Sequence, residues 1–475
     1  MLSRQNSSLW LAIATALVCA STAAGADWPM WGANGSRNMV SAETGIPRTW
    51  DIKTKDKIKW VAEIGSQSYG NPVIADGKVF LGTNNELLRD PEQGDDRGVL
   101  MVFREADGEF LWQMTHEKLA AGRVNDWPEQ GVCSSPAVVD GVVYYVSNRA
   151  EVLALDAEGF RDGENDGPVQ NETHTSEADG DVIWAMDMYN DLGVFPHNMA
   201  ATSPLVVGDM LFVNTSNGVD ESHINIPSPR SPSFLALNRH TGEILWEDNS
   251  PGRNILHGQW SSPAYGEAGG KMQVIFAGGD GWLYSFVPET GDLIWKFDTN
   301  PKDSEWKQGR GDRNNLIATP VILDGIVYIA VGQDPEHGEG VGHLWAIDAS
   351  GEGDVTESHI VWHHPFRRTI STVAIHDGIV YIPNFSGFFH ALDRETGKLV
   401  WEYDMLAAVW GSPYVVDGKV MLGDEDGDLT VLKAGREMEV LAEIGFGNVI
   451  YSTPVAANGT LYVMTRSHLY AIAGD

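Results

Sequence analysis

The phrase ALNRHTGEILW at Ala236–Trp246 returns as ALDRETGKLVW at Ala391–Trp401, with the same residue at six of eleven positions. Two looser copies read FREADGEFLW (Phe103–Trp112) and FVPETGDLIW (Phe286–Trp295). A unit that recurs along a chain buries its apolar face against neighbouring copies of itself, so the repeat determines the architecture. The sequence therefore predicts a fold built from packed copies of one small unit.

Each unit is predicted to contain four short antiparallel strands. In one unit the first two strands read SPAVVD and VVYYV, and Asp140-Gly141 between them favours a tight hairpin. A third strand, VLALD, follows, and the unit ends on an apolar strand that contains Trp184. The alternating, β-branched and aromatic composition is typical of strands, and no long segment has the period of a helix.

Eight such units follow one another, and the ends of the chain predict a closed ring. The units begin at Pro72, Pro136, Pro204, Pro263, Pro320, Val373, Pro413 and Pro454. The eighth unit stops after its third strand, whereas Ile58–Ile64 is a strand with no unit ahead of it. Pairing this strand with Leu461–Ile472 would remove two open sheet edges. We expect an all-β, eight-bladed β-propeller of four-stranded antiparallel blades, closed by an N-terminal strand that completes the last blade.

The repeated tryptophans are expected to hold neighbouring blades together. An outer-strand Trp beside a Thr-Gly turn can bury its ring against the next blade while its indole N–H finds a carbonyl. The residues with this expected role are Trp60, Trp112, Trp184, Trp246, Trp295, Trp362 and Trp401.

The pattern Ala-x-Asp/Asn-x-x-Thr-Gly-x-x-x-Trp resembles the tryptophan-docking motif of quinoprotein-type, or PQQ-repeat, eight-bladed propellers, over residues 51–475. That family includes dehydrogenases that use pyrroloquinoline quinone (PQQ) and BamB-type scaffolds of outer-membrane assembly. The segment Asp27–Trp50 also resembles the start of exported PQQ-repeat proteins. The resemblance implies the fold and leaves the function open, because the same ring serves enzymes and non-enzymes.

Residues 1–26 are predicted to be a signal peptide. Arg4 lies in a short polar head, Leu9–Ala20 is apolar, and Ala24-Gly25-Ala26 is a small-residue cleavage site. We expect a periplasmic or secreted protein with an N-terminal extension at 27–50, a propeller at 51–475 and no transmembrane segment. Cleavage would leave Cys133 as the remaining cysteine, so no intrachain disulfide is expected, and Cys133 is predicted to be buried.

The charge of the chain limits its partners. Its 66 acidic and 32 basic residues give a net charge of −34, which argues against nucleic acids and anionic lipid surfaces. The charge is compatible with a small anionic ligand or a protein partner, and it does not determine the oligomeric state.

The residues just before each Ser-Pro or Thr-Pro are expected to crowd a central funnel, because these passages lead into the innermost strands. An arginine guanidinium binds a carboxylate through two hydrogen bonds, and an indole ring stacks on a flat ring. The funnel therefore suits a planar anion such as PQQ, which is a tricarboxylate. Of the adjacent arginines 367 and 368, one is expected to point inward. The alternative is that the polar residues satisfy one another. The candidate cofactor-binding residues are His257, Trp260, Arg313, Asn315, Arg367, Arg368 and Trp410.

A calcium site is predicted in the loop DGENDG, Asp162–Gly167. The candidate ligands are Asp162, Glu164 and Asp166, and the spacing matches the start of an EF-hand loop. Position twelve is Thr173 instead of glutamate, so calcium there would be structural. The alternative is a solvated acidic turn.

The leading hypothesis is an exported propeller that binds a ligand or protein partner through its loop-rich face and central funnel. A PQQ-dependent alcohol or sugar dehydrogenase is the first alternative. Against it, the adjacent cysteine pair of those enzymes is absent, no c-type haem motif is present, and no motif marks a catalytic residue. The second alternative is a BamB-like assembly scaffold; the bulky Val18 before Cys19 argues against a lipid anchor.

Overall fold

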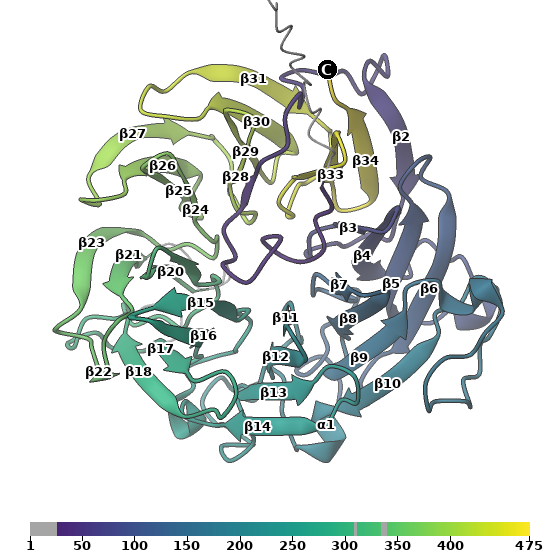
Figure 1. Cartoon of the computed structure of the whole chain (residues 1–475), viewed down its shortest axis with the longest axis horizontal. Helices are drawn as coiled ribbons and strands as arrows, with labels where there is room; N and C mark the ends of the chain where they lie inside the picture. The colour runs from purple at the N-terminus through teal and green to yellow at the C-terminus, as the bar shows by residue number, and fades with distance from the viewer. Residues whose placement is uncertain (1–25, 308–310, 334–339) are drawn as a thin grey trace, which may run out of the picture.

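The structure is a computed structural model that describes residues 26–307, 311–333 and 340–475. Residues 1–25, which hold almost all of the predicted signal peptide, lie outside the described part. Eight antiparallel sheets stand like blades around a central axis, as predicted (Figure 1). Among the described residues, no helix combines the length and the apolar character that crossing a membrane requires.

Blades 1 to 4 follow in chain order. Blade 1 contains β3 (Val73–Ala75), β4 (Lys78–Asn84), β5 (Arg97–Arg104) and β6 (Phe110–Glu117). Blade 2 contains β7 (Ala137–Val139), β8 (Val142–Val146), β9 (Glu151–Asp156) and β10 (Val182–Asp187). Blade 3 contains β11 (Leu205–Val207), β12 (Met210–Asn214), β13 (Phe234–Asn238) and β14 (Ile244–Asp248). Blade 4 contains β15 (Ala264–Ala268), β16 (Lys271–Ala277), β17 (Trp282–Phe286) and β18 (Leu293–Asp298), and the short β22 (Gly353–Asp354) joins its outer edge.

Blades 5 to 8 complete the ring. Blade 5 contains β19 (Val321–Leu323), β20 (Ile326–Val331), β21 (Val341–Asp348) and β23 (Ile360–Arg367). Blade 6 contains β24 (Ala374–His376), β25 (Ile379–Pro383), β26 (Phe388–Asp393) and β27 (Leu399–Asp404). Blade 7 contains β28 (Tyr414–Val416), β29 (Lys419–Gly423), β30 (Asp428–Lys433) and β31 (Val440–Gly445), with β1 (Val40–Ser41) parallel to β28. Blade 8 contains β32 (Val455–Ala457), β33 (Thr460–Met464), β34 (His468–Ala473) and β2 (Ile58–Glu63).

Short helical turns lie in the connections between strands. They are η1 (Pro91–Gln93), η2 (Gly159–Asp162), α1 (Met188–Asp191) and η3 (Gly252–Asn254). Every predicted unit start precedes the first residue of an innermost strand by one position, so the predicted division into eight blades is confirmed.

The ring closes as the sequence predicts. β2 pairs antiparallel with β34, with Ile58 opposite Ile472 and Glu63 opposite His468. The last blade therefore takes three strands from the C-terminus and its outer strand, β2, from the N-terminus, so β34 is not left as an open edge.

The tryptophans join neighbouring blades, which explains the phrase that repeats in the sequence. Trp184 of blade 2 donates its indole N–H to the carbonyl of Arg239 in blade 3 at 2.9 Å. Its ring lies against Gly242 of the Thr-Gly turn, where φ is +73° and an added Cβ would come within 2.6 Å of the ring. Glycine is therefore required there for both its backbone conformation and its lack of a side chain.

Other girdle tryptophans make the same contact with the next blade. Trp60, Trp112, Trp246, Trp362 and Trp401 donate to the carbonyls of Glu105, Ala157, Pro288, Arg394 and Gly435. Trp295 departs from this pattern, because its indole N–H donates to the Gln273 side chain of its own blade at 2.8 Å.

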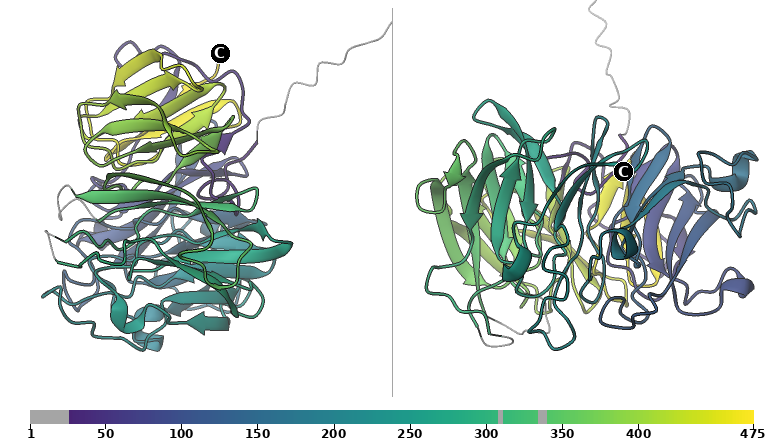
Figure 2. Two further views of the ribbon diagram at one scale, coloured as in Figure 1. Left: turned by 90° about the vertical axis from the view of Figure 1, so that its left-hand side faces the viewer. Right: turned by 90° about the horizontal axis from the view of Figure 1, so that it is seen from below.

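Residues 27–50, here called the N-terminal strap, cross the centre of one face of the ring (Figure 1). The strap lies on the hairpin face, which carries the Asp-Gly turns, and long connections extend from the opposite face, the loop face (Figure 2). Its apolar side chains Trp28, Met30, Met39, Ile46 and Trp50 are buried.

The strap contacts the innermost strand of one blade after another. Trp28 exchanges backbone hydrogen bonds with Ile74 of blade 1, and the carbonyl of Pro29 accepts from Val138 of blade 2. Further on, the carbonyl of Met39 accepts from Val415 of blade 7. Blades 3 to 6 are contacted through strap residues 35–38, and blade 8 is contacted through Glu43 and Gly45. The strap therefore touches all eight blades.

Arg37 is the central anchor of the strap. Its side chain is completely buried, and its guanidinium donates to the carbonyls of Trp31, Ser203, Pro204 and Pro263 at 2.7–3.3 Å. Burial lowers the pKa of Arg37 to about 9, so the group still carries its charge at pH 7.

Candidate functional site

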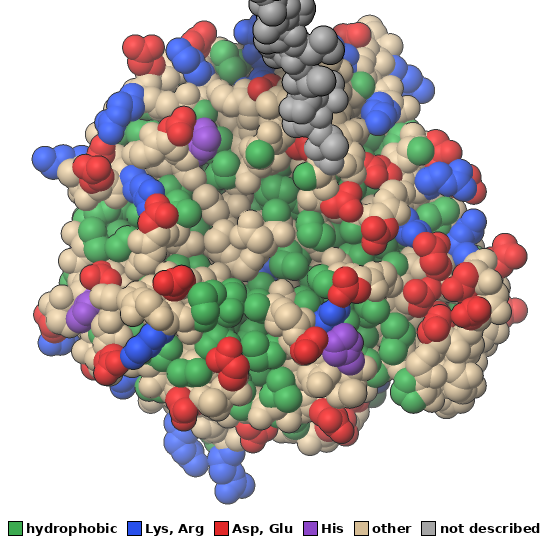
Figure 3. All heavy atoms as spheres, in the orientation of Figure 1, with side chains coloured by type: hydrophobic (Ala, Val, Ile, Leu, Met, Phe, Trp, Pro, Cys, Tyr) green, Lys and Arg blue, Asp and Glu red, His purple; other side chains and the backbone are tan. Residues whose placement is uncertain are grey.

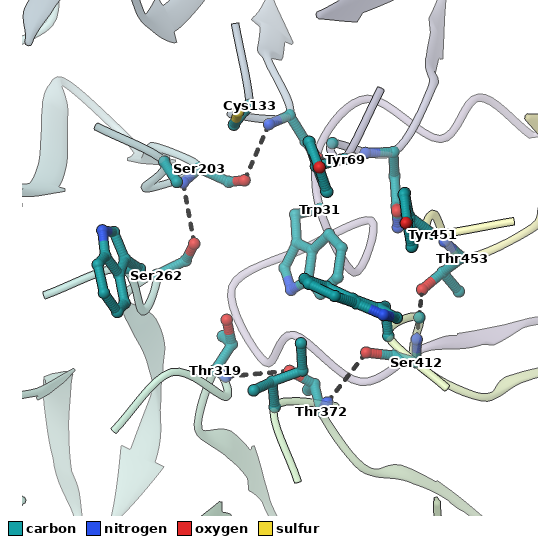
Figure 4. Close-up of a pocket in the computed structure, with 18 of the residues that line it drawn as sticks. Trp31, Tyr69, Cys133, Ser203, Ser262, Thr319, Thr372, Ser412, Tyr451 and Thr453 are labelled. Atoms are coloured by element: carbon teal, nitrogen blue, oxygen red, sulfur yellow. Dashed lines mark hydrogen bonds between the residues drawn. The ribbon is translucent and has the colours of Figure 1, made fainter. Parts of the chain in front are cut away.

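A central cavity lies on the axis of the ring, and equivalent positions of the eight blades line it. Each blade contributes the residue one position before its start and the residue three positions before it, counted from the eight unit starts. Because neighbouring blades place these positions at the same height, they form two stacked rings of eight residues (Figure 4).

The residues one position before each unit start form a ring of small polar side chains, here called the serine–threonine belt. Its members are Asn71, Ser135, Ser203, Ser262, Thr319, Thr372, Ser412 and Thr453. In seven successive pairs, a backbone N–H donates to the side-chain oxygen of the next blade at 2.7–3.0 Å. This belt explains why Ser or Thr precedes nearly every unit start, since the side chain joins two blades.

The second ring is mostly aromatic and aliphatic. Its members are Tyr69, Cys133, Ala201, Trp260, Ile317, Ile370, Trp410 and Tyr451. Tyr69 stacks on Tyr451 with ring centroids 5.1 Å apart, and Trp410 lies 4.9 Å from Tyr451. These three residues come from blades 1, 7 and 8, whereas Trp260 comes from blade 4, so flat faces line opposite sides of the cavity.

The cavity is closed at one end and lined by uncharged groups. Trp31 of the strap forms its floor beside the serine–threonine belt, where the space measures about 150 Å³. The wider part toward the loop face measures about 320 Å³ and is also lined by Trp127, Gln130, Asn198 and Met199. Among the described residues that line these two parts, no Asp, Glu, Lys, Arg or His occurs.

Two of the predicted site residues face this cavity. Trp260 and Trp410 both line it. The indole N–H of Trp260 donates to the carbonyls of His197 and Met199, and that of Trp410 donates to the Glu425 carboxylate. These bonds fix both rings in place, which suits a stacking surface.

The three predicted arginines are not among the residues that line the cavity. Arg313 forms a salt bridge with Asp298 at 3.0 Å. The buried Arg368 donates to Asn314 and to the carbonyl of Gly311. The exposed Arg367 lies over the Phe388 ring at 5.2 Å. Adjacent residues on a strand point to opposite sides, and of this pair Arg368 is the buried one.

The two remaining predicted residues lie beside the cavity and are buried. The Asn315 amide donates to the carbonyl of Gly258 at 3.2 Å. His257 packs edge-on against Trp260, with ring centroids 5.2 Å apart. Whether the predicted residues bind a ligand stays a prediction.

The predicted calcium loop forms an acidic cluster at the outer edge of blade 2, where acidic side chains gather at the right of Figure 3. The carboxylates of Asp156, Asp162 and Asp166 lie within 4.8 Å of one another. Asp156, at the end of β9, was not among the predicted ligands. Glu164 is exposed, and its backbone N–H donates to Asp162 at 2.8 Å.

The acidic cluster should make stability depend on pH through Asp156. Burial first, and then the Asp162 and Asp166 carboxylates, raise the pKa of Asp156 to about 6 in the folded protein, from 3.8. Its ionised form therefore destabilises the fold above pH 6, and protonation removes this cost as the pH falls from 6 to 3.8. Asp156→Asn should raise stability at pH 8 by about 1 kcal/mol after solvent screening, and leave it unchanged at pH 4. Thermal melts of both proteins at the two pH values measure this.

Calcium is expected to relieve the same repulsion. At pH 8, calcium should raise the melting temperature of the wild type by a few degrees, and Asp162→Ala with Asp166→Ala should erase the rise. Identical wild-type melts with calcium and with chelator would leave the cluster as a solvated acidic turn.

Comparison with known proteins places this architecture in a family. Residues 169–353 and 342–437, together more than half of the chain, match the model of the PQQ-repeat family described as "Outer membrane protein assembly factor BamB". The chain belongs to this family. The PQQ-repeat resemblance predicted from the tryptophan phrase is thus confirmed.

Individual relatives include members of both branches expected from the sequence and also a "Tetrathionate hydrolase" of Acidithiobacillus ferrooxidans, 24% identical over 379 residues, which cover 72% of this chain and 64% of that protein. BamB of Yersinia pestis is 24% identical over 295 residues, which cover 61% of this chain and 63% of that protein. The "1-butanol dehydrogenase (cytochrome c)" of Thauera butanivorans is 25% identical over 179 residues, which cover 35% of this chain and 22% of the dehydrogenase. A solved "Europium-containing methanol dehydrogenase" superposes with a TM-score of 0.66 at 13% identity, covering 94% of this chain and 98% of that one. This last likeness concerns the fold alone.

The cavity of this PQQ-repeat protein suits the flat ring of PQQ but not its three negative charges. Trp260 and Trp410 offer flat faces to a planar ring, but the described lining residues offer no cation to its three carboxylates. Burying unpaired carboxylates costs several kcal/mol each. The residues present therefore fit an uncharged flat group better than PQQ itself.

Sequence reasoning missed part of the cavity. Ala201, Ile317 and Ile370 occupy the same ring as Trp260, and Trp31 closes the floor. The first three were detectable, because all eight members of the ring lie three residues before a unit start. Nothing in the sequence indicated that Trp31 would reach the axis.

Proposed function

We propose that this PQQ-repeat propeller is an exported binding protein whose loop face receives a partner that inserts a flat, uncharged group into the central cavity. The observation that carries the proposal is the cavity itself. Among the described residues, the cavity widens toward the loop face, is lined by fixed aromatic rings and has Trp31 of the strap as its floor. Its size lies within the range of small-ligand sites.

The aromatic lining of the cavity supports binding over scaffolding alone. Tyr69, Trp410 and Tyr451 form a continuous aromatic wall whose rings touch one another. Such a wall gains free energy by stacking on a flat guest, whereas a channel that served only to hold blades together would need no aromatic lining. The wall would stack in the same way on an aromatic side chain of a protein partner and on a small aromatic ligand.

Replacing Trp260 should separate binding from stability. A neutral flat probe such as 2-naphthol should bind to the mature protein, and Trp260→Ala should weaken this binding about tenfold through lost stacking. Trp246→Ala is the control: its ring joins blades 3 and 4, so this change should cost about 3–5 kcal/mol of stability without altering the affinity of the remaining folded protein. Calorimetric titration and thermal melts measure the two effects.

The dehydrogenase alternative is tested by the same titration with PQQ. Because the described lining carries no cation, we expect PQQ to bind no more tightly than the neutral probe. Saturable PQQ binding that is strengthened by calcium and lost in Trp260→Ala would overturn our proposal in favour of a quinone-dependent enzyme. If neither probe binds, the loop face alone would carry the function, as in a BamB-like scaffold.

A further inference from the structure

Three histidines meet behind the cavity wall, and no part of the proposed function uses them. His197 lies between β10 and β11, His223 lies in the loop between β12 and β13, and His257 lies between β14 and β15. One ring nitrogen of each lies within 4.8 Å of the others. The three rings are mutually packed, with centroids 4.4–4.8 Å apart.

Backbone contacts bring these three segments together. The N–H of Val219 donates to the carbonyl of His257 at 3.0 Å, and the N–H of Gly218 donates to the carbonyl of Phe195 at 2.8 Å. A Cβ on Gly218 would lie 2.6 Å from the Cβ of His197, so only glycine permits this approach. The convergence is therefore fixed by the fold.

The loop that carries His223 is tied down by its own hydrogen bonds. The backbone N–H of His223 donates to the carbonyl of Asp220 at 2.9 Å. The Asp220 carboxylate accepts in turn from Ser222 and Asn225. His223 is thereby held over the two more deeply buried histidines.

The hydrogen bond of His197 orients its ring for ligation. Nδ1 of His197 lies 2.8 Å from the carbonyl of Val219. A carbonyl accepts, so Nδ1 is the donor, and the neutral form of this imidazole has its lone pair on Nε2. A histidine ligand that donates its other N–H to a backbone carbonyl is the usual arrangement in metal sites, where it fixes the tautomer. Both His197 and His257 are about 1% exposed or less.

We propose that His197, His223 and His257 form a three-histidine site for a divalent transition metal of the zinc class. Three imidazoles suit Zn²⁺, Cu²⁺ or Ni²⁺, whereas Ca²⁺ and Mg²⁺ prefer oxygen. Ligands at about 2.0–2.1 Å in a tetrahedral site lie about 3.4 Å from one another, so modest ring rotations close the present separations. The described residues supply three imidazoles, and a tetrahedral ion takes one further ligand.

The site adjoins the central cavity through Trp260. The indole N–H of Trp260 donates to the carbonyl of His197 at 3.1 Å, and its ring packs against His257. Two other groups of possible ligands occur among the described residues, Asp90 with His174 and Asp179, and the acidic cluster. Both are rich in carboxylates, which distinguishes them from the histidine site in metal preference.

Metal titration of the untagged mature protein tests the proposal. After chelator treatment and dialysis, Co²⁺ should bind with one equivalent and give the visible absorption bands of a four-coordinate ion with nitrogen ligands. Zn²⁺ should displace it, and calcium should not. His223→Ala should weaken binding at least about 100-fold. Because His223 is only half-buried and lies in a loop, this variant should keep the wild-type fold.

The control is His240→Ala, which removes an exposed histidine of the same blade and should leave the Co²⁺ spectrum unchanged. His257→Gln provides a second test, since the amide keeps polarity and approximate size without a good nitrogen ligand. Octahedral Co²⁺ spectra, or affinities that are equal in wild type, His223→Ala and His257→Gln, would overturn the proposal. The result is independent of 2-naphthol binding, so either proposal can fail alone.

Discussion

Deleting residues 27–64 should produce a protein that no longer unfolds in one cooperative step. The deletion removes β2, leaves β34 as an open edge and exposes the surface that Trp60 and Ile64 bury. Loss of these two side chains alone costs about 3–6 kcal/mol, and open strand edges promote aggregation. Thermal and urea unfolding, followed by circular dichroism and light scattering, should show a broad, low transition with aggregation.

A transplanted strand provides the matched control. The chain ends beside β2, because the N–H of Ala473 donates to the carbonyl of Lys57 at 2.8 Å. A protein of residues 65–475 followed by a short glycine linker and residues 51–64 can therefore restore the same pairing as a hairpin. It should recover cooperative unfolding although it lacks the strap. A deleted protein that melts like the parent would contradict the closure model.

The second large effect is expected at Arg37. Arg37→Met keeps the length of the side chain and removes all donors from four buried carbonyls. Leaving such acceptors unpaired costs about 1–3 kcal/mol for each that water cannot reach, so we expect a total loss of about 3–5 kcal/mol. Urea unfolding at pH 7 measures this loss as a lower midpoint.

Arg37→Lys separates charge from geometry. Lysine keeps the charge but has three donors at one nitrogen, so it cannot reach carbonyls on opposite sides of the guanidinium. We expect Arg37→Lys to be less stable than the wild type and more stable than Arg37→Met. Equal stability of all three proteins would mean that the hydrogen bonds of Arg37 contribute nothing to the stability of the ring.

The propeller was predictable from the sequence because its signals are local and repeated. The phrase that ends at Trp246 encodes both a turn and a tryptophan that docks on the next blade, where the ring lies against Gly291. Ser-Pro and Thr-Pro pairs marked six of the eight unit starts, and the regular spacing placed the other two at Pro72 and Val373. Closure by Ile58–Ile64 followed from a missing strand at one end and a surplus strand at the other.

The candidate site was less predictable because it depends on pairings that the sequence does not display. Arg313 was expected in the funnel, yet Asp298, fifteen positions earlier, forms an ion pair with it at the end of blade 4. The three histidines come from segments up to sixty residues apart, and only their meeting gives them a joint chemistry. The strap has no repeat at all, so its path over the blades could not be inferred.

The strap has a consequence for the order in which the molecule is assembled. Its residues are synthesised before the blades, whereas their partners Val415, Gly459 and Asp475 are synthesised after blades 1 to 6. Until then Trp28, Met30 and Met39 have no complete surface to cover, and β2 waits for β34. The strap can therefore complete its contacts only after blades 7 and 8 have formed. A chain cut before blade 7 would leave the buried side chains of the strap without part of the surface that covers them.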